Sequence, residues 1–162
     1  MSFKETPSQT VGPFFAILLD WHGGPYAAPE DAPDGCWLSG TVYDGAGEPV
    51  PDALVEVWQP AFNGFARCLG GADGGYRLWI RRPGPHPDGQ APHVALSVFA
   101  RGLIDRVVTR VYFPEDADAH AADPVLNAVS DHAGTLVAAK AEDGYRFDIH
   151  LQGPHETVFF SI

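Results

Sequence analysis

One stretch, residues 38–59, limits the folds open to this chain more than any other. Its sequence is LSGTVYDGAGEPVPDALVEVWQ, and apolar or small residues recur at every second position in two runs, Leu38, Gly40 and Val42, then Ala53, Val55 and Val57. A period of two indicates strands, and the Asp-Gly and Gly residues between the runs are typical of a turn. Two such strands predict a β-sandwich, which would display the loop after Trp58, the proline-rich loop near His86 and the N-terminal arm from one rigid scaffold.

The rest of the chain extends this pattern. Alternation predicts further strands over residues 76–81, 93–101, 106–113, 145–152 and 157–162. Residues 83–89 must be a loop, because three prolines in alternate positions cannot join a sheet. Asp123 before Pro124 predicts the start of one short helix that ends near Ser130. The expected fold is therefore all-β: a β-sandwich of mostly antiparallel strands with long loops and one short helix. We expect a single domain over residues 1–162, with residues 1–19 as an N-terminal arm.

Charge narrows the function classes. Lys and Arg number 10 against 21 Asp and Glu, a net charge of −11, which argues against nucleic acid or an anionic membrane as partner. The start of the chain lacks a basic region followed by an apolar run, and no stretch approaches the roughly 18 apolar residues of a membrane span. We expect a cytoplasmic protein. Cys36 and Cys68 form no C-x-x-C motif, so free thiols are expected.

The predicted strand 106–113 has residues on one face that suit a ligand. Arg106, Val108, Arg110 and Tyr112 share one of its faces. Two arginines and a tyrosine suit an anionic aromatic ligand, and they also suit an ordinary solvated sheet face.

The histidines raise the question of a metal. His86 and His93 flank the proline-rich loop, and a strand site would require a second ligand two residues after His93, where Ala95 stands. Taken alone, His93 fits a hydrogen-bonded histidine at a strand start better than a ligand. His150, on the polar face of its strand, is expected to be inert. The sequence has no G-x-S-x-G motif for a hydrolase and no G-x-x-x-x-G-K phosphate loop.

Motifs over nearly the whole chain carry a family resemblance. They are the arm TPSQTVGPFF (6–15), GTVYDG (40–45), VEVWQ (55–59), the RC and DG pairs (67–68 and 73–74), PGP (83–85), FARG (99–102), TRVYF (109–113), YRFDI (145–149) and the tail ETVFF (156–160). This set resembles the intradiol ring-cleavage dioxygenases. The arm and the tail resemble most the alpha subunits of the members that cleave protocatechuate.

Catalytic chains of that family bind Fe(III) through two tyrosines and two histidines. Here the loop 59–65 has no tyrosine, His86 stands where the second tyrosine follows P-G-P, and the H-x-H motif reads His93-Val94-Ala95. Three of the four ligands are absent, so the resemblance implies that this chain holds no metal and that a homologous beta subunit carries the Fe(III).

The resemblance also implies a role. The chain would complete the substrate pocket of the beta subunit, which cleaves protocatechuate with O2 to 3-carboxy-cis,cis-muconate. Carried onto this sequence, the substrate-binding residues are Thr10, Gly12 and Pro13 of the arm, together with Arg110, which is also the expected catalytic residue. Tyr112 is a weaker candidate, and loops 20–36 and 59–66 are expected to be shorter than in the family.

Two alternatives stay open at this stage. One is a self-sufficient dioxygenase whose atypical metal site uses His86, His93 and another residue. The other is a non-enzymatic binding module, because the pattern G-x-V-x-D-x-x-G-x-P-V-x-x-A-x-V-x-V also occurs in transthyretin-like domains.

Overall fold

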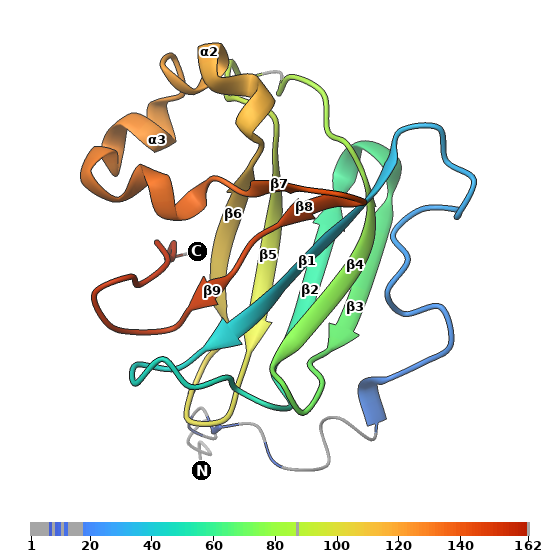
Figure 1. The fold of residues 1–162 in the computed structure, drawn as a ribbon, viewed down its shortest axis with the longest axis vertical. Coiled ribbons are helices and arrows are strands. Elements are labelled where there is room, and N and C mark those ends of the chain that lie inside the picture. The colour runs from blue at the N-terminus through green and yellow to red at the C-terminus, as the bar shows by residue number, and fades with distance from the viewer. Residues whose placement is uncertain (1–6, 8, 11, 13–17, 87, 162) are drawn as a thin grey trace, which may run out of the picture.

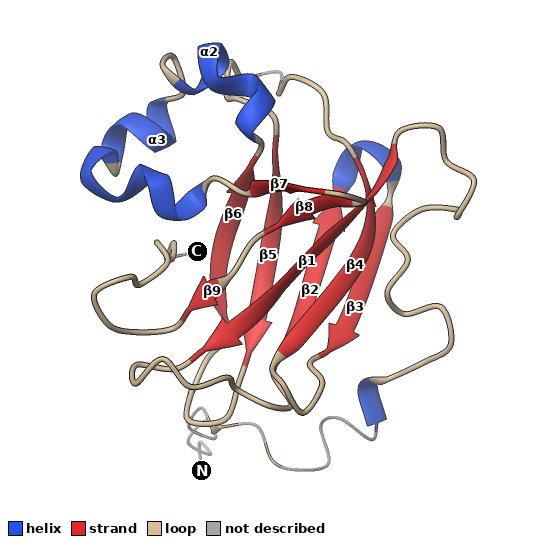
Figure 2. Cartoon of the chain, in the orientation of Figure 1, coloured by secondary structure: helices blue, strands red, loops and turns tan. Residues whose placement is uncertain are grey.

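The chain folds into two facing β-sheets, with most of the short helices at one end (Figures 1 and 2). The structure, a computed structural model, describes residues 7, 9–10, 12, 18–86 and 88–161. Its strands are β1 Gly35–Tyr43, β2 Leu54–Gln59, β3 Gly64–Leu69, β4 Gly75–Arg81, β5 His93–Phe99, β6 Val107–Tyr112, β7 Ala139–Ala141, β8 Gly144–Arg146 and β9 Ile149–His150. The helices are α2 Ala117–His120 and α3 Pro124–Ala128, with 3-10 turns η1 Pro60–Phe62, η2 Pro114–Asp116 and η3 Ser130–Leu136.

One sheet has the strand order β3-β2-β5-β6, and all of its pairings are antiparallel. The other has the order β4-β1-β8-β7, with β9 also paired to β1, and its β1–β8 and β1–β9 pairings are parallel. The two strands of the opening stretch thus lie in opposite sheets. The predicted β-sandwich of mostly antiparallel strands is confirmed.

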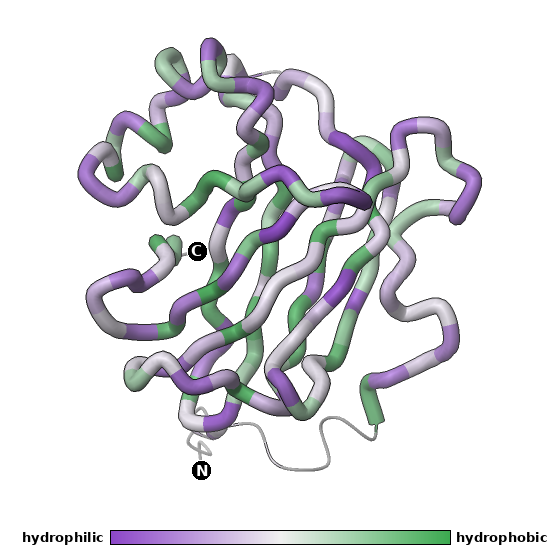
Figure 3. The backbone as a smooth tube through the Cα atoms, in the orientation of Figure 1, coloured by the Kyte–Doolittle hydropathy of each residue, from purple (hydrophilic) through white to green (hydrophobic). Residues whose placement is uncertain are grey.

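The alternating residues of the strands meet between the sheets and form the main core. Leu38, Val42, Val55, Val57, Leu78, Ile80, Leu96 and Val111 have no measurable exposure there. Apolar stretches accordingly follow the strands in Figure 3, while many connecting loops are polar. Burial of this kind stabilises a fold by about 25 cal/mol per Å² of apolar surface, so the alternation sets which way each sheet faces.

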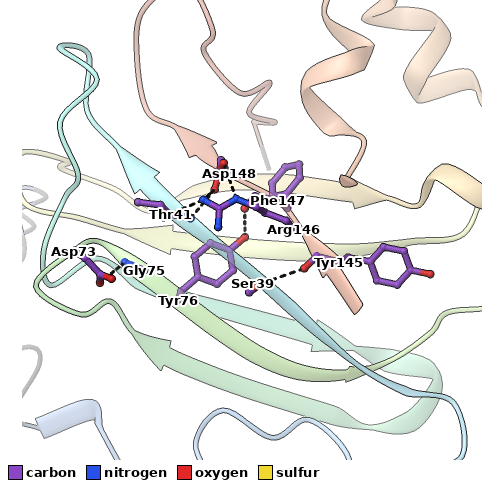
Figure 4. Close-up of polar contacts among 9 residues, drawn as sticks. All are labelled: Ser39, Thr41, Asp73, Gly75, Tyr76, Tyr145, Arg146, Phe147 and Asp148. Carbon is purple, nitrogen blue, oxygen red and sulfur yellow. Dashed lines mark hydrogen bonds and ion pairs between the residues drawn. The ribbon is translucent and has the colours of Figure 1, made fainter. Parts of the chain in front are cut away.

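The strand predicted over 145–152 runs beside β1 but is interrupted at Phe147. Phe147 lies between β8 and β9, and its carbonyl oxygen accepts a hydrogen bond from the Tyr76 hydroxyl at 2.6 Å (Figure 4). A Cβ on Gly40 would lie 1.8 Å from that same oxygen, so only glycine permits this close approach. Thr41 N–H donates to Asp148 at 2.9 Å, which fixes the residue that follows.

Two expectations for the end of the chain need correction. Residues 157–161 form no strand, because only isolated bonds join them to β6: Phe160 N–H donates to the Val108 carbonyl at 2.8 Å, and the Thr109 hydroxyl donates to the Val158 carbonyl at 2.8 Å. The single predicted helix is α3, but the structure adds α2 and the 3-10 turns η2 and η3 beside it in the chain, and η1 between β2 and β3. The elements α3 and η3 bury Leu126, Leu136 and Tyr112 in a second, smaller apolar cluster.

The loop over residues 20–34 covers the outer edges of β3 and β4. Gly24 accepts a hydrogen bond from Arg67 N–H at 2.7 Å, and Pro25 accepts one from Trp79 N–H at 2.8 Å. Covered edges do not pair with other chains. Cys36 and Cys68 are free thiols, as predicted, and burial raises the pKa of Cys36 to about 11. Within the described part of the chain, no helix is long and apolar enough to cross a membrane.

Candidate functional site

The outer face of the β3-β2-β5-β6 sheet carries Arg110, one of the predicted site residues. In register, Ala95 of β5 stands opposite Arg110 of β6 on one side and opposite Trp58 of β2 on the other, and Trp58 stands opposite Phe65 of β3. Directly opposed residues point to the same face of a sheet. Trp58 is 48% exposed and Phe65 37%, so this row of four residues faces away from the core.

Arg110 is half-buried, and its partners are uncharged. Its Nη1 donates to Gln90 Oε1 at 2.6 Å and to the Tyr112 hydroxyl at 3.3 Å, and the guanidinium carbon lies 5.5 Å from the centre of the Phe160 ring. A cation above an aromatic face is stabilised by the ring without losing its charge. Arg110 is thus held by several contacts and keeps its charge.

Most other arginines of the described residues are neutralised locally. Six of them form ion pairs with Asp or Glu: Arg67, Arg77, Arg81, Arg82, Arg101 and Arg146. Arg110 has no carboxylate of the described residues within the 4.0 Å of an ion pair, although the chain has 21 acidic residues. A half-buried guanidinium without a counter-ion suits an anion from outside the chain.

His93 stands opposite Tyr112 in the next row of the same strand pair. Its Nδ1 lies 2.9 Å from the Ala91 carbonyl oxygen, and its ring stacks on that of His86 with centroids 5.6 Å apart. Burial lowers the pKa of His93, and the positive charges of Arg110 and His86 lower it further, against the Ala91 carbonyl, which raises it. The ring is thus neutral at pH 7, with its Nε2 lone pair free of the backbone bond.

Tyr112 packs against Leu126 of α3 and Leu136 of η3 in the smaller apolar cluster. Its ring contacts His93 at 5.2 Å and His120 of α2 at 5.7 Å between centroids. Burial raises the pKa of Tyr112, partly offset by Arg110. The hydroxyl is therefore protonated at neutral pH and can act as a hydrogen-bond partner.

Comparison with known proteins places this arrangement in a family. A family model described as Dioxygenase matches residues 11–153. The protocatechuate 3,4-dioxygenase alpha chain of Burkholderia cepacia is 40% identical over 195 aligned positions, covering 99% of each chain. This chain belongs to the intradiol ring-cleavage dioxygenases. The family match confirms the predicted resemblance and favours it over a transthyretin-like binding module.

Two further comparisons agree with this membership. The protocatechuate 3,4-dioxygenase beta chain of Burkholderia cepacia is 32% identical over 154 positions, covering 74% of this chain and 65% of that one. The dioxygenase domain of a dioxygenase and carbohydrate-binding fusion from Streptomyces sp. SirexAA-E has the same fold, with a TM-score of 0.62, 24% identity and 93% and 99% coverage. Alignment to the alpha chain spans 195 positions against 162 residues here, so the alignment contains gaps in this dioxygenase chain.

The described residues of this dioxygenase chain do not fit the family's iron. No three His, Cys, Asp or Glu side chains among them converge on one point. His93 presents one imidazole nitrogen, His86 is exposed beside it, and Ala95 offers no donor atom. The predicted atypical metal site of His86, His93 and a third residue therefore has no third donor of these types in the described part of the chain.

Thr10 of the predicted arm lies apart from Arg110. The Thr10 hydroxyl accepts a hydrogen bond from Gly102 N–H at 2.9 Å, in the turn between β5 and β6, and Thr10 and Gly12 are exposed. Ala95, opposite Arg110, stands four residues before the end of β5, which is about 13 Å along the strand. Pro13 lies outside the described residues. Thr10 and Arg110 thus occupy separate parts of this chain.

Sequence reasoning missed Gln90, Phe160 and the full role of Asp123. Asp123 was expected to cap a helix, and it does accept hydrogen bonds from Val125 and Leu126 N–H at 2.8 and 3.0 Å. Its second oxygen accepts a bond from Ala91 N–H at 2.7 Å, which no local pattern indicates. His150, expected to be inert, stacks on Tyr43 with centroids 4.9 Å apart, in a different part of the fold.

Proposed function

We propose that this chain is the alpha, non-iron-binding subunit of a protocatechuate 3,4-dioxygenase, and that it completes the substrate pocket of a homologous beta subunit that holds Fe(III). The enzyme would cleave protocatechuate with O2 between its two hydroxyl groups to give 3-carboxy-cis,cis-muconate. The chain would act as one domain over residues 1–162, with residues 1–19 as the arm. The names of its relatives, alpha and beta chains of one enzyme in one organism, support such an assembly.

The surroundings of Arg110 are the observation that supports this proposal most. Its half-buried guanidinium has no carboxylate partner among the described residues and lies on the outer sheet face. Protocatechuate is an aromatic carboxylate, so Arg110 can bind its carboxylate or the negative charge that develops as the ring opens. Because the described residues hold no cluster for a metal, iron on the partner would supply the activation of the catechol.

The arm and Arg110 would contribute in different ways. The exposed Gly12 lets backbone approach a ligand closely, and Pro13 reduces the entropy that the arm loses on docking. Since Thr10 and Arg110 lie apart in this chain, they need not face the same copy of the beta subunit.

The test compares the chain alone with the chain co-expressed with its beta candidate. Iron content, visible absorption and O2-dependent loss of protocatechuate are measured for each. We expect the lone chain to be colourless and inactive and the pair to be coloured and active. Iron and turnover in the lone chain would contradict the proposal and make His86 and His93 the first residues to mutate.

A variant then tests the residue itself. Arg110→Ala in the assembled enzyme should lower kcat/KM for protocatechuate by about 30-fold or more, the worth of a charged hydrogen bond, without loss of iron. Arg106→Ala is the matched control, because Arg106 stands just before β6 and is exposed. An unchanged rate in Arg110→Ala would remove Arg110 from the site.

A further inference from the structure

The hydrogen bonds of Arg110 use only one of its nitrogens. Nη1 donates both to Gln90 Oε1 and to the Tyr112 hydroxyl. Neither Nε nor Nη2 donates a hydrogen bond to a described residue. These two groups form the side of the guanidinium that can bind a carboxylate with two parallel hydrogen bonds. The guanidinium is thus held through Nη1, while Nε and Nη2 make no hydrogen bond to a described residue.

Gln90, which holds Arg110, is fixed by its neighbours. The next residue, Ala91, donates its N–H to Oδ2 of Asp123 at 2.7 Å, and Asp123 is fully buried. The Gln90 carbonyl oxygen accepts a bond from His86 N–H at 3.3 Å. The backbone of Gln90 is therefore anchored on both sides, and its amide oxygen has a defined place beside β6.

The neutrality of Gln90 matters as much as its position. An amide oxygen orients a guanidinium without cancelling its charge, whereas a carboxylate there would form an ion pair like those of the other six arginines. Asp123, the buried carboxylate nearby, has its oxygens occupied by the N–H groups of Ala91, Val125 and Leu126. The positive charge of Arg110 stays available to an external anion.

We propose that Gln90 is a positioning residue that holds Arg110 in place to bind the carboxylate of an aromatic substrate. This inference rests on the proposed function, because it requires that Arg110 binds that carboxylate. Gln90 acts through Arg110 and does not touch the substrate. It therefore affects the binding of ligands with a carboxylate, and it has no effect on ligands that lack one.

The experiment uses the assembled alpha–beta enzyme with Gln90→Leu, which removes the hydrogen bond, and Gln90→Glu, which keeps the size and adds a negative charge. The readouts are KM and kcat for protocatechuate, and the inhibition constants of 4-hydroxybenzoate, which has the carboxylate, and of phenol, which does not. Gln152→Leu is the matched control, an exposed glutamine that lines a separate cavity with Asp44 and Arg101.

We expect both Gln90 variants to raise the KM for protocatechuate and the inhibition constant of 4-hydroxybenzoate by about tenfold, the worth of one hydrogen bond to a charged group. The inhibition constant of phenol should not change, and iron content should match that of the parent enzyme. Gln152→Leu should leave all of these values as they are.

Three results would overturn the inference, and Arg110→Lys in the same assay separates them. If the Gln90 variants change nothing while Arg110→Lys weakens 4-hydroxybenzoate, the positioning role is wrong and the proposed function stands. If neither Arg110→Lys nor Arg110→Ala changes anything, Arg110 lies outside the substrate site, and the proposed function loses the observation on which it rests. If the Gln90 variants weaken phenol and 4-hydroxybenzoate equally, Gln90 is a structural residue. Should Gln90→Leu not assemble, Gln90→Glu decides among these results.

Discussion

His93 donates its Nδ1 proton to the carbonyl oxygen of Ala91 over 2.9 Å, and this bond sets the tautomer of the ring. A neutral imidazole that donates from Nδ1 keeps its lone pair on Nε2, which is the form that binds metals. The chain thus retains one well-oriented potential donor atom. It lacks the second, because Ala95 occupies the next position on the same face of β5.

One substitution should therefore create a metal site. Ala95→His would place two imidazoles at positions i and i+2 of one strand, an arrangement that suits Ni²⁺, Cu²⁺ or Zn²⁺. At a Ni²⁺ concentration 100 times its Kd, binding would stabilise the fold by about 2.7 kcal/mol and raise Tm by about 5 °C or more. Thermal unfolding with and without Ni²⁺ checks this. Ala139→His, at an exposed strand alanine of the other sheet, is the control and should show a smaller shift.

The titration of His93 is a second prediction. Burial lowers its pKa, and Arg110 and His86 add to the effect, so NMR of the ring protons should give a midpoint below 6.5. As pH falls through 6.5, the unfolded chain takes up this proton before the folded one, so His93 lowers the free energy of unfolding at acid pH.

Arg110→Ala should raise that midpoint, but leave it below 6.5, because burial is the largest cause and persists. A His93 midpoint that is unchanged by Arg110→Ala would show that the two side chains do not interact electrostatically.

Asp123 provides a prediction about stability. Burial raises the pKa of its carboxyl, but three backbone N–H bonds outweigh this, so the net pKa is lowered. Asp123→Ala removes a helix cap and leaves Ala91 N–H without its partner, which should cost about 2 to 4 kcal/mol of unfolding free energy. Urea unfolding at pH 7 measures this cost. A loss below that of an ordinary surface substitution would contradict the anchoring role.

Asp123 should also make the stability of the fold depend on pH. A carboxyl whose folded pKa is depressed adds stability above its ordinary pKa of 3.8, and this stability is lost as pH falls through the folded value. Asp123→Asn can still cap the helix with its oxygen but has no proton to gain. The difference in stability between the parent and Asp123→Asn should therefore shrink as pH falls below 3.8.

The sequence predicts those features of the fold and the site that depend on neighbouring residues, and not those that depend on contacts between distant ones. The faces of β5 and β6 follow from alternation alone, which is why Arg110 and Tyr112 could be assigned to one face in advance. The contact between Gln90 and Arg110 depends on the anchoring of Ala91 by Asp123, 32 residues away, and no periodicity encodes it.

At the tail, the sequence predicts a strand that the structure does not form. Residues 157–160 have the composition of a strand, but the Thr109 hydroxyl binds the Val158 carbonyl that a backbone ladder would use. Side-chain competition of this kind is invisible to a pattern of apolar residues. The break at Phe147 could have been suspected only from Gly40, since a glycine inside a strand often marks close approach of another backbone.

The arm provides the last prediction. Thr10 is tied to the β5–β6 turn through one hydrogen bond from Gly102 N–H to its hydroxyl. Thr10→Val keeps the size and removes the acceptor, so the arm should lose its attachment at this point, and kcat/KM for protocatechuate in the assembled enzyme should fall about three- to tenfold. Thr10→Ser keeps the acceptor and should behave like the parent.

Because the iron lies elsewhere in the proposed assembly, the iron content of both variants should equal that of the parent. A loss of iron in Thr10→Val would mean that the arm supports assembly and does not act on the substrate pocket alone.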